Sequence, residues 1–491
     1  MGKKYGFKSF MGAAAICICI GFCGCTRPGV PVKSAMSVSG AEYKEEENTQ
    51  EVLREAGSEA LEETDSEEQE REEAIEKACG LILSSADAKI TAEYPLDQAF
   101  LDWVLQEYGE ECILELAEKA QAPGQSQDIW YSLTQNTIHT LWLLYGKDTG
   151  CQWDDPEHVE WKACASPDEI TLAFTGDINF SEGYPTTRHL DGCANGIADC
   201  FSEDLLAVMN GMDVMMINNE FTYSARGEPL KGKTYTFRAD PSRAGLLHAF
   251  GTDIVNLANN HVYDYGPDAL LDTIDALDRE HIPHVGAGAN IKEAGMPYYF
   301  ICNGRKIAIV AATQIERSTN YTKEATEDTP GVLKTLNPDK FTAVIEEADK
   351  NSDYVIAVVH WGTEGDSYYG QDQEELARAF VDAGADAIIG GHTHCLQGFE
   401  IMDGVPIIYS LGNFWFSSKT LDTGLAKVTI GKDGELTLSF IPCIQKNFKT
   451  SLVTEEAEKD RIFSFLQKHS ARGTALTEDG TLLQTQQQNM E

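Results

Sequence analysis

An apolar run ends in two closely spaced histidines in the stretch Ala387-Ile388-Ile389-Gly390-Gly391-His392-Thr393-His394. The run from Ala387 to Gly390 has the length and composition of a buried strand. In open α/β sheets ligands bind beyond the carboxyl ends of the strands, which is where His392 and His394 fall. Residues two apart in an extended segment point to the same side, so the two imidazoles can address adjacent metal ions. The stretch therefore predicts an α/β fold with a metal site at its strand ends.

Outward from this stretch, apolar runs of strand length alternate with amphipathic helical stretches from Ile170 onward. The other expected strands are residues 170–175, 213–217, 253–258, 306–312, 354–359 and 407–411, and the expected helices include residues 267–279, 338–350 and 373–383. Such alternation predicts a layered α/β fold. Further on, alternation around the turn at Gly431 to Gly434 predicts a hairpin over residues 424–441, followed by a short helix over 455–469.

Side chains suited to hold metal ions follow five of these expected strands. They are two carboxylates, an amide and four imidazoles: Asp177, Glu220, Asn260, His261, His360, His392 and His394. Each has an ordinary explanation when taken alone, since Asp177 could cap a helix and His360 could be a buried core histidine. The whole chain has only 11 histidines, so four of them at strand ends favour a metal site over these explanations.

The N-terminus has the pattern of an export signal. Lys3, Lys4 and Lys8 precede an uncharged stretch over residues 9–24, which is shorter than the roughly 20 residues of a membrane span. The stretch closes at Cys25 in a way that resembles a bacterial lipoprotein signal, in which that cysteine carries the lipid. We therefore expect an exported protein, lipid-anchored through Cys25 at the outer face of the cell membrane. The alternative is an ordinary signal peptide or an uncleaved anchor.

The charge of the chain opposes one class of partner. Lysine and arginine number 38 against 79 aspartate and glutamate residues, so the net charge is −41, and nucleic acid is not an expected partner. Residues 42–77 hold 16 of the acidic residues and only 4 basic ones. Such a segment buries too little apolar surface to offset its ordering entropy. It predicts an acidic disordered stalk, with an acidic docking tail as the alternative.

These patterns divide the chain into five expected segments. They are a lipoprotein-type signal peptide (1–24), the acidic stalk (25–78), a small helical region (79–166), the α/β domain (167–450) and a C-terminal helix with a disordered tail (451–491). The helical region shows apolar residues at helical spacing on both sides of a Pro-Gly pair, which predicts a helical hairpin with its aromatic residues in a core.

The cysteines give a mixed signal. Of 13 cysteines, three leave with the signal and Cys25 is the lipid site, so 13 − 4 = 9 remain, an odd number. Cys193 and Cys200 are the best candidates for a local disulfide, because a short loop separates them. Cys395 beside His394 is the expected unpaired one, and a metal-ligand role for it is the weaker alternative. The sequence does not determine the connectivity.

With these motifs in place, the chain resembles the CapA-type poly-γ-glutamate capsule-synthesis proteins over about residues 168–447. The motifs that carry the resemblance are Gly176-Asp177-Ile178, Asn219-Glu220, Ala258-Asn259-Asn260-His261 with Asp264-Tyr265-Gly266, His360-Trp361-Gly362, Gly384-Ala385-Asp386, Gly391-His392-Thr393-His394 and Tyr409-Ser410-Leu411-Gly412-Asn413-Phe414. That family is similar to the calcineurin-like metallophosphoesterases, so the resemblance implies their layered α/β sandwich. A lipid anchor on the outer face of the membrane also fits the family.

The resemblance implies a centre for one or two divalent metal ions. The ligands it implies are Asp177 and His394 for one ion, Asn260, His360 and His392 for a second, and Glu220 as the bridge. Mixed oxygen and imidazole donors suit manganese, iron or zinc. Two ions together would stabilise both the attacking and the leaving oxygens of an in-line displacement.

Two departures from the broader phosphoesterase pattern refine this expectation. Asn179 stands where a histidine is usual, and Glu220 stands where the bridging acid is usually aspartate. We therefore expect one tightly held ion and a weaker second one. The catalytic residues implied by the resemblance are His261, free to protonate a leaving oxygen, and Asp264 of the same motif.

Other residues are candidates for contact with a substrate. Asn179, Arg226 and Arg238 lie near the metal motifs in the sequence, and cations beside a metal centre could hold an anionic group. Lys231 and Lys233 belong to the same segment as the two arginines. The alternative is that these cations are solvated surface residues. Similarly, three aromatic residues could either line a cleft or belong to the core: Trp361, Trp415 and Phe416.

The expected function is a part in making, exporting or anchoring an extracellular anionic polymer of the poly-γ-glutamate type, with metal-dependent hydrolytic chemistry. The expected partners are that polymer or a phosphate-containing envelope substrate, the membrane, and membrane subunits of a polymer synthase. One alternative is a metal-dependent phosphoesterase that acts on another envelope phosphate ester. A second is a binding scaffold that keeps the metal only for structure. The motifs do not choose the substrate, because they fix the metal edge and not the loops around it.

Overall fold

The computed structural model describes residues 71, 73–84, 98–120, 130, 133–134, 141, 144–145 and 158–485. The predicted signal peptide, Cys25 and most of the predicted stalk lie outside these residues. Within the described part of the chain, no helix is both long enough and apolar enough to cross a membrane.

A small helical unit precedes the main domain in the sequence. Its longest helix is α2 (Gln98–Ala120), which is kinked at Gly109, where φ is 83°. The aromatic residues form its core as predicted, with the Phe100 and Trp130 rings 5.9 Å apart. Residues 71 and 73–84 are also helical, and Cys79 and Ile82 are buried in the same core. The helical region therefore begins earlier than the predicted residue 79.

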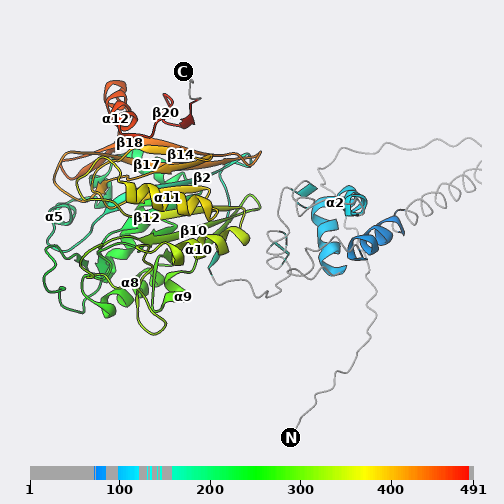
Figure 1. Cartoon of the computed structure of the whole chain (residues 1–491), viewed down its shortest axis with the longest axis horizontal. Coiled ribbons are helices and arrows are strands. Elements are labelled where there is room, and N and C mark those ends of the chain that lie inside the picture. Colours follow the sequence, from blue (N-terminus) through cyan, green and yellow to red (C-terminus); the bar gives the residue numbers. More distant parts are fainter. Residues whose placement is uncertain are drawn as a thin grey trace, which may run out of the picture. The chain divides into compact units, whose positions relative to one another are not determined.

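The main domain contains two mixed β-sheets (Figure 1). The first has seven strands, in the order β1 (Val159–Lys162), β9 (Tyr298–Cys302), β10 (Arg305–Thr313), β12 (Tyr354–His360), β13 (Ala387–Gly391), β15 (Val405–Ile408) and β14 (Phe399–Met402). Strands β10, β12, β13 and β15 are parallel to one another. Their carboxyl ends therefore meet at one edge of the sheet.

The second sheet has eight strands. Its main path runs β19 (Lys449–Leu452), β18 (Leu436–Lys446), β17 (Leu421–Gly431), β2 (Glu169–Ile178), β3 (Val214–Asn219), β6 (Ile254–Asn256) and β7 (His284–Val285), while β16 (Asn413–Trp415) pairs with β2. Strands β2, β3, β6 and β7 are parallel, and β17 and β18 form the predicted hairpin. The strand and helix positions predicted from hydrophobic periodicity agree closely with these elements.

Alternating residues of the strands belong to different hydrophobic clusters, as the period of two requires. Leu172 and Phe174 of β2 share one buried cluster with Ile307 and Ile309 of β10, so one face of each sheet contributes to a common core. The opposite face of the first sheet packs against α10 (Asp339–Lys350) and α11 (Gln371–Asp382). The opposite face of the second sheet packs against α7 (Glu203–Asn210), η2 (Pro241–Phe250) and α8 (Pro267–Arg279).

Shorter elements complete the domain. The remaining helices are α5 (Pro185–Asp191), α6 (Ile197–Cys200), α9 (Ile291–Ala294) and α12 (Glu456–His469). The remaining strands are β4 (Thr222–Tyr223), β5 (Arg238–Ala239), β8 (Ala287–Gly288), β11 (Gly331–Val332), β20 (Thr474–Leu476) and β21 (Leu482–Gln484). In Figure 1, α8 and α9 lie at the lower end of this domain and α12 at its upper end.

Both predicted borders of the α/β domain differ from the observed ones. Strand β1 was assigned to the helical region, but it pairs in parallel with β9 and extends the first sheet. At the other end, the predicted border at residue 450 falls inside β19, and Ile462 and Leu466 of α12 are buried in the core that the two sheets share. The glutamine-rich end from residue 483 is predicted to be disordered, but Leu483 and Gln484 still belong to β21 and pair with β20. Residues 486–491 lie outside the described part.

Candidate metal centre

The ends of parallel strands bring the predicted metal ligands together. Asp177 lies near the end of β2, Glu220 directly follows β3, and His360 is the last residue of β12. The loop after β6 supplies Asn260, and the loop after β13 supplies His392 and His394. Both sheets thus contribute ligands, because the carboxyl ends of their parallel strands lie at the same edge.

Four donors converge at what we call the buried half of the centre, formed by Glu220, Asn260, His360 and His392. From His360 Nε2, the distances are 2.8 Å to Asn260 Oδ1, 3.1 Å to His392 Nδ1 and 3.3 Å to Glu220 Oε1. All four residues are buried. Two oxygens and two imidazoles at this spacing form a donor set that suits a divalent transition metal.

A second cluster, which we call the open half, consists of Asp177, His394 and Asn413, together with the shared Glu220. The His394 Nδ1 atom lies 3.1 Å from Asp177 Oδ2 and 2.7 Å from Asn413 Oδ1. Ligand atoms of Asp177, Glu220 and His394 lie within 4.8 Å of one another, and the same holds for Glu220, His360 and His392. Glu220 is thus the residue common to both halves, where the sequence predicts the bridging ligand.

Asn413 belongs to a motif that the sequence singled out, but no role was predicted for it. It reaches the centre because β16 pairs with β2, which places Asn413 opposite Asp177. The pairing depends on Gly176, since a Cβ atom on this residue would lie 2.0 Å from the carbonyl oxygen of Gly412. The same approach lets the backbone N–H of Asp177 donate to that carbonyl at 2.9 Å.

A chain of side-chain amides holds Asp177 in place. Asn218 Nδ2 donates to Asp177 Oδ1 at 2.5 Å, and Asn256 Nδ2 donates to Asn218 Oδ1 at 3.1 Å. Each amide comes from the next strand of the second sheet. Such partners outside the ligand shell orient a metal ligand and tune its donor strength.

The two histidines after β13 do not lie in an extended segment. The prediction that an extended chain points both imidazoles to the same side is therefore wrong. His392 and His394 both have left-handed backbone conformations, with φ of 96° and 59°. Non-glycine residues rarely adopt positive φ, and strained residues of this kind concentrate at functional sites. The turn nevertheless directs the rings into different halves of the centre, with their centroids 6.0 Å apart.

The electrostatics of these residues fit a bound cation. Burial and the nearby charge of Asp177 hold the pKa of Glu220 well above its usual range, and neither of its buried oxygens receives a hydrogen bond from the described residues. Burial lowers the pKa of His360 to about 3 and that of His392 well below its usual value. These imidazoles are therefore neutral, which is the form that binds metal. A cation would compensate the buried carboxylates.

The predicted catalytic pair lies at the rim of the centre. His261 Nδ1 is 2.7 Å from Asp264 Oδ2, and His261 Nε2 is 4.0 Å from Glu220 Oε1. Asp264 thus orients the ring so that Nε2 faces the centre. Burial lowers the pKa of His261, although the charge of Asp264 opposes this effect.

Lys233 joins this pair, although it was predicted only as one of several cations. Its Nζ atom lies 2.7 Å from Asp264 Oδ1 and 3.0 Å from Glu316 Oε1, and it donates to the backbone carbonyl of Asn260. The side chain is only 7% exposed. It therefore contacts both the predicted catalytic pair and the loop that carries Asn260.

The three predicted substrate contacts have partners in the structure. Arg226 binds Asp272 of α8, with its Nη2 2.5 Å from Oδ1, and the Arg238 guanidinium lies 4.3 Å from the centroid of the Tyr265 ring. Asn179 accepts a hydrogen bond from the Ser181 N–H at 2.7 Å and is fully buried. Each of the three thus has a partner within the protein, and their contact with a substrate stays a prediction.

Three aromatic residues and Cys395 had alternative roles in the sequence analysis, and the structure shows where each one lies. Trp361 and Trp415 are fully buried and belong to the hydrophobic clusters, so they are core residues. Phe416 packs beside a ligand, with its ring centroid 4.9 Å from that of His394. Cys395 donates to the backbone carbonyl of Asp366 at 3.3 Å and belongs to none of the metal-binding clusters of the described residues.

Comparison with known proteins identifies the class to which this fold and site belong. The family described as "Bacterial capsule synthesis protein PGA_cap" matches residues 171–418, which include all the residues of the metal centre. The chain belongs to this family.

Two curated relatives are named for capsule or PGA biosynthesis. The chain is 36% identical over 230 residues to the capsule biosynthesis protein CapA of Bacillus anthracis, an alignment that covers 45% of this chain and 55% of that protein. It is 30% identical over 316 residues to the PGA biosynthesis protein CapA of Bacillus subtilis strain 168, covering 61% of this chain and 80% of that protein. The chain thus spans only a little over half of the Bacillus anthracis relative.

Solved structures resemble the chain much more weakly. A 5'-nucleotidase from Candida albicans SC5314 is 10% identical, with a TM-score of 0.29, and the match covers 57% of this chain and 52% of that one. The protein TT1561 of Thermus thermophilus is 9% identical with a TM-score of 0.31, covering 55% of this chain and 98% of that one.

Proposed function

We propose that this protein is a metal-dependent hydrolase of the cell envelope that acts in the synthesis, export or anchoring of an extracellular anionic polymer of the poly-γ-glutamate type. Family membership supports the polymer, since the relatives are named for capsule and PGA biosynthesis. The partners proposed with it are the polymer and the membrane subunits of its synthase. The fold proposed for the domain is the layered α/β sandwich of the calcineurin-like metallophosphoesterases.

The observation that carries the enzymatic part is the position of His261. Its ring is not among the clustered ligands, yet Nε2 faces Glu220 at 4.0 Å while Asp264 holds Nδ1. A scaffold that used metal only for structure would have no need of an oriented imidazole at this place.

Each residue of the centre then has a definite task. Asn260, His360 and His392 would hold one ion and Asp177 and His394 the other, Glu220 would serve both, and the metal would be manganese, iron or zinc. When bound, the ions supply Lewis-acid activation of the substrate and of water. His261 accepts a proton at Nε2 and returns it to the leaving oxygen, while Asp264 and Lys233 keep the ring aligned.

Replacement of His261 separates an enzyme from a scaffold. His261→Gln should keep wild-type metal content and thermal stability but lose about 10²- to 10⁴-fold in the rate of hydrolysis of an activated phosphate ester with Mn²⁺ present. It should also fail to restore polymer production in a deletion strain. Asp177→Ala serves as the matched variant that disturbs the metal itself.

The results for the two variants distinguish an enzyme from a scaffold with a structural metal, and the proposed reaction from other reactions. If His261→Gln restores polymer production fully and Asp177→Ala does not, the metal is structural and the enzymatic proposal fails. If the wild type is inactive on every phosphate ester while His261 stays essential for polymer display, the reaction is another hydrolysis or transfer at the same centre. If the protein hydrolyses an envelope phosphate ester and its deletion leaves polymer production unchanged, it is a phosphoesterase that acts on a different substrate.

We also propose that the protein is exported and lipid-anchored at the outer face of the membrane through Cys25. The support is the sequence pattern of residues 1–25. Cys25→Ser should move the protein from the membrane fraction to the soluble or unprocessed pool. Membrane association that survives both the substitution and a carbonate wash would point to an uncleaved anchor.

A further inference from the structure

A second group of metal-binding side chains lies outside the centre described above. It consists of His189, Cys193 and Cys200, whose ligand atoms all lie within 4.8 Å of one another. His189 lies in α5, Cys193 two residues beyond its end, and Cys200 at the end of α6. No residue of the metal centre belongs to this group.

The two thiols are close neighbours. Their Sγ atoms lie 4.0 Å apart, and both cysteines are free thiols in the structure. Two sulfur ligands of one tetrahedral Zn²⁺ ion, each about 2.3 Å from the metal, are separated by a similar distance. The sulfur atoms therefore stand at a spacing that a zinc ion can bridge.

The histidine is positioned as a third donor. Its ring stacks on Phe448, with the centroids 5.0 Å apart and the planes at 19°. Among the described residues, neither ring nitrogen of His189 has a hydrogen-bond partner, although the ring is within reach of both thiols. The stacking thus fixes the ring without occupying its nitrogens.

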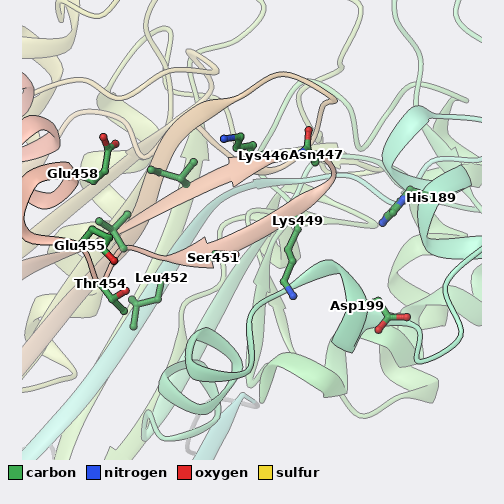
Figure 2. Close-up of a pocket in the computed structure, with 12 residues that line it drawn as sticks. His189, Asp199, Lys446, Asn447, Lys449, Ser451, Leu452, Thr454, Glu455 and Glu458 are labelled. Carbon is green, nitrogen blue, oxygen red and sulfur yellow. The ribbon is translucent and has the colours of Figure 1, made fainter.

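The cluster lies beside a cavity of about 540 Å³, which His189 lines together with residues of the β18–β19 hairpin. Figure 2 shows His189 at the same end of this cavity as Asp199. Cys200 is fully buried, whereas His189 and Cys193 are half-buried. One side of the cluster is therefore closed by protein, and the other is open to solvent.

We propose that His189, Cys193 and Cys200 form a second, independent metal site, which takes Zn²⁺. Two thiolates and one imidazole are ligands that zinc prefers, and these soft donors distinguish the site from the oxygen-rich centre. Three protein ligands leave one tetrahedral position, which water from the cavity fills. The ion links α5 to α6 beside the β18–β19 hairpin.

Cobalt substitution tests this site separately from the metal centre. The full-length protein, purified under reducing conditions and loaded with Co²⁺, should show a near-ultraviolet thiolate-to-cobalt absorption band, since the centre itself contains no thiolate. Cys193→Ser and His189→Gln should weaken or abolish the band, while the matched variant Cys395→Ser keeps it. Asp177→Ala, which disturbs the centre, should also keep it.

Zinc content gives the second readout. Cys193→Ser should lose one equivalent of zinc per chain relative to wild type, and Cys395→Ser should lose none. Zinc should also slow alkylation of Cys193 in the wild type. The proposal is overturned if the cobalt band is missing from the wild type, or if Cys193→Ser retains all of its zinc. A disulfide between Cys193 and Cys200 would also overturn the proposal. The decisive result is a disulfide that is present in protein purified without reductant and that, after reduction, forms again although zinc is present.

Discussion

The buried half and the open half of the metal centre share Glu220 but differ in their exposure to solvent. In the buried half the His360 side chain is fully buried. In the open half the His394 side chain is 20% exposed. A ligand set that solvent can reach exchanges its ion more readily than one enclosed by protein. The two halves should therefore hold their ions with different strength.

The imidazoles of the two halves also respond oppositely to their surroundings. Burial lowers the pKa values of His360 and His392, so these rings are neutral and ready to bind metal. Burial acts on His394 too, but the hydrogen bond and charge of Asp177 outweigh it and raise its pKa. Among these three imidazoles, a proton therefore competes with the metal at His394 of the open half. The comparison supports one tight and one exchangeable ion on grounds independent of Asn179.

The shared carboxylate gives the largest expected effect. Glu220→Gln keeps the shape of the side chain but removes the charge common to both halves, so both ions should bind more weakly, by more than the roughly 10- to 100-fold that is typical of partners outside the ligand shell. Metal analysis after dialysis measures the loss. Glu324→Gln, which removes a carboxylate from a surface ion pair with Lys340, is the control and should bind as wild type does. Retention of one ion at wild-type affinity would show that Glu220 does not bridge.

Single histidine variants should then separate the halves. His360→Ala should remove the ion that survives dialysis, because three other donors of the buried half converge on its Nε2 atom. His394→Ala should remove only the exchangeable ion. Metal-to-protein ratios before and after dialysis distinguish the two variants, with the surface variant His248→Ala as control. Equal losses from both would mean that the ions bind as one cooperative unit.

Much of the fold was predictable because several central strands are apolar runs of their own and because β17 and β18 alternate around a recognisable turn. The runs that became β2, β10 and β12 are buried along almost their whole length, so hydrophobicity alone marks them. Strand β1 escaped prediction because it has only four residues and two of them, Glu160 and Lys162, are charged. Lys162 pairs with Asp253 from another strand region, a compensation that sequence spacing does not reveal.

The candidate site was predictable where its residues directly follow strands or lie in the loops just after them. Glu220 and His360 follow or end strands, so their meeting follows from the parallel topology. Asn413 arrives through the pairing of β16 with β2, and Lys233 arrives on a long loop. Arg226 is bonded to Asp272 of α8, a pairing that sequence spacing does not show, and its contact with a substrate stays a prediction. These outcomes depend on tertiary contacts that periodicity and motif spacing do not encode.

Acidification should empty the open half first. The folded pKa of His394 is raised, so as pH falls through that pKa the ring gains a proton and loses the lone pair that binds metal. His360, with a pKa of about 3, and His392, with a pKa well below its usual value, keep theirs. Stepwise desalting from pH 8 to about pH 5, followed by metal analysis, should show one ion lost before the other. Simultaneous loss of both ions would contradict the difference between the halves.

In the metal-free protein, the raised pKa of His394 gives acid the opposite effect, because protonation stabilises the fold instead of weakening metal binding. A raised folded pKa means that protonated His394 is stabilised by Asp177, so this pair contributes stability below the unfolded pKa of about 6.5. The contribution is lost as pH rises through the folded pKa. Acid therefore strengthens the metal-free pair but weakens metal binding in the open half.

The smallest expected effect concerns Asn413, the amide of the open half that lies beside His394. Asn413→Ala removes the oxygen 2.7 Å from His394 Nδ1 but leaves Asp177, Glu220 and His394 in place. If the amide orients the ring, affinity for the exchangeable ion should fall about 10-fold, the lower end of the range for partners outside the ligand shell.

The ion of the buried half should be unaffected, because none of its four donors contacts Asn413. Titration of dialysed protein with Mn²⁺ measures both affinities, and Asn351→Ala, which removes a surface amide bonded to Glu347, controls for the loss of an amide elsewhere. A loss of 100-fold or more would instead make Asn413 a ligand in its own right. The open half would then have four protein donors, counting Glu220, and its weaker binding would follow from solvent access and protonation of His394 rather than from a missing donor at Asn179.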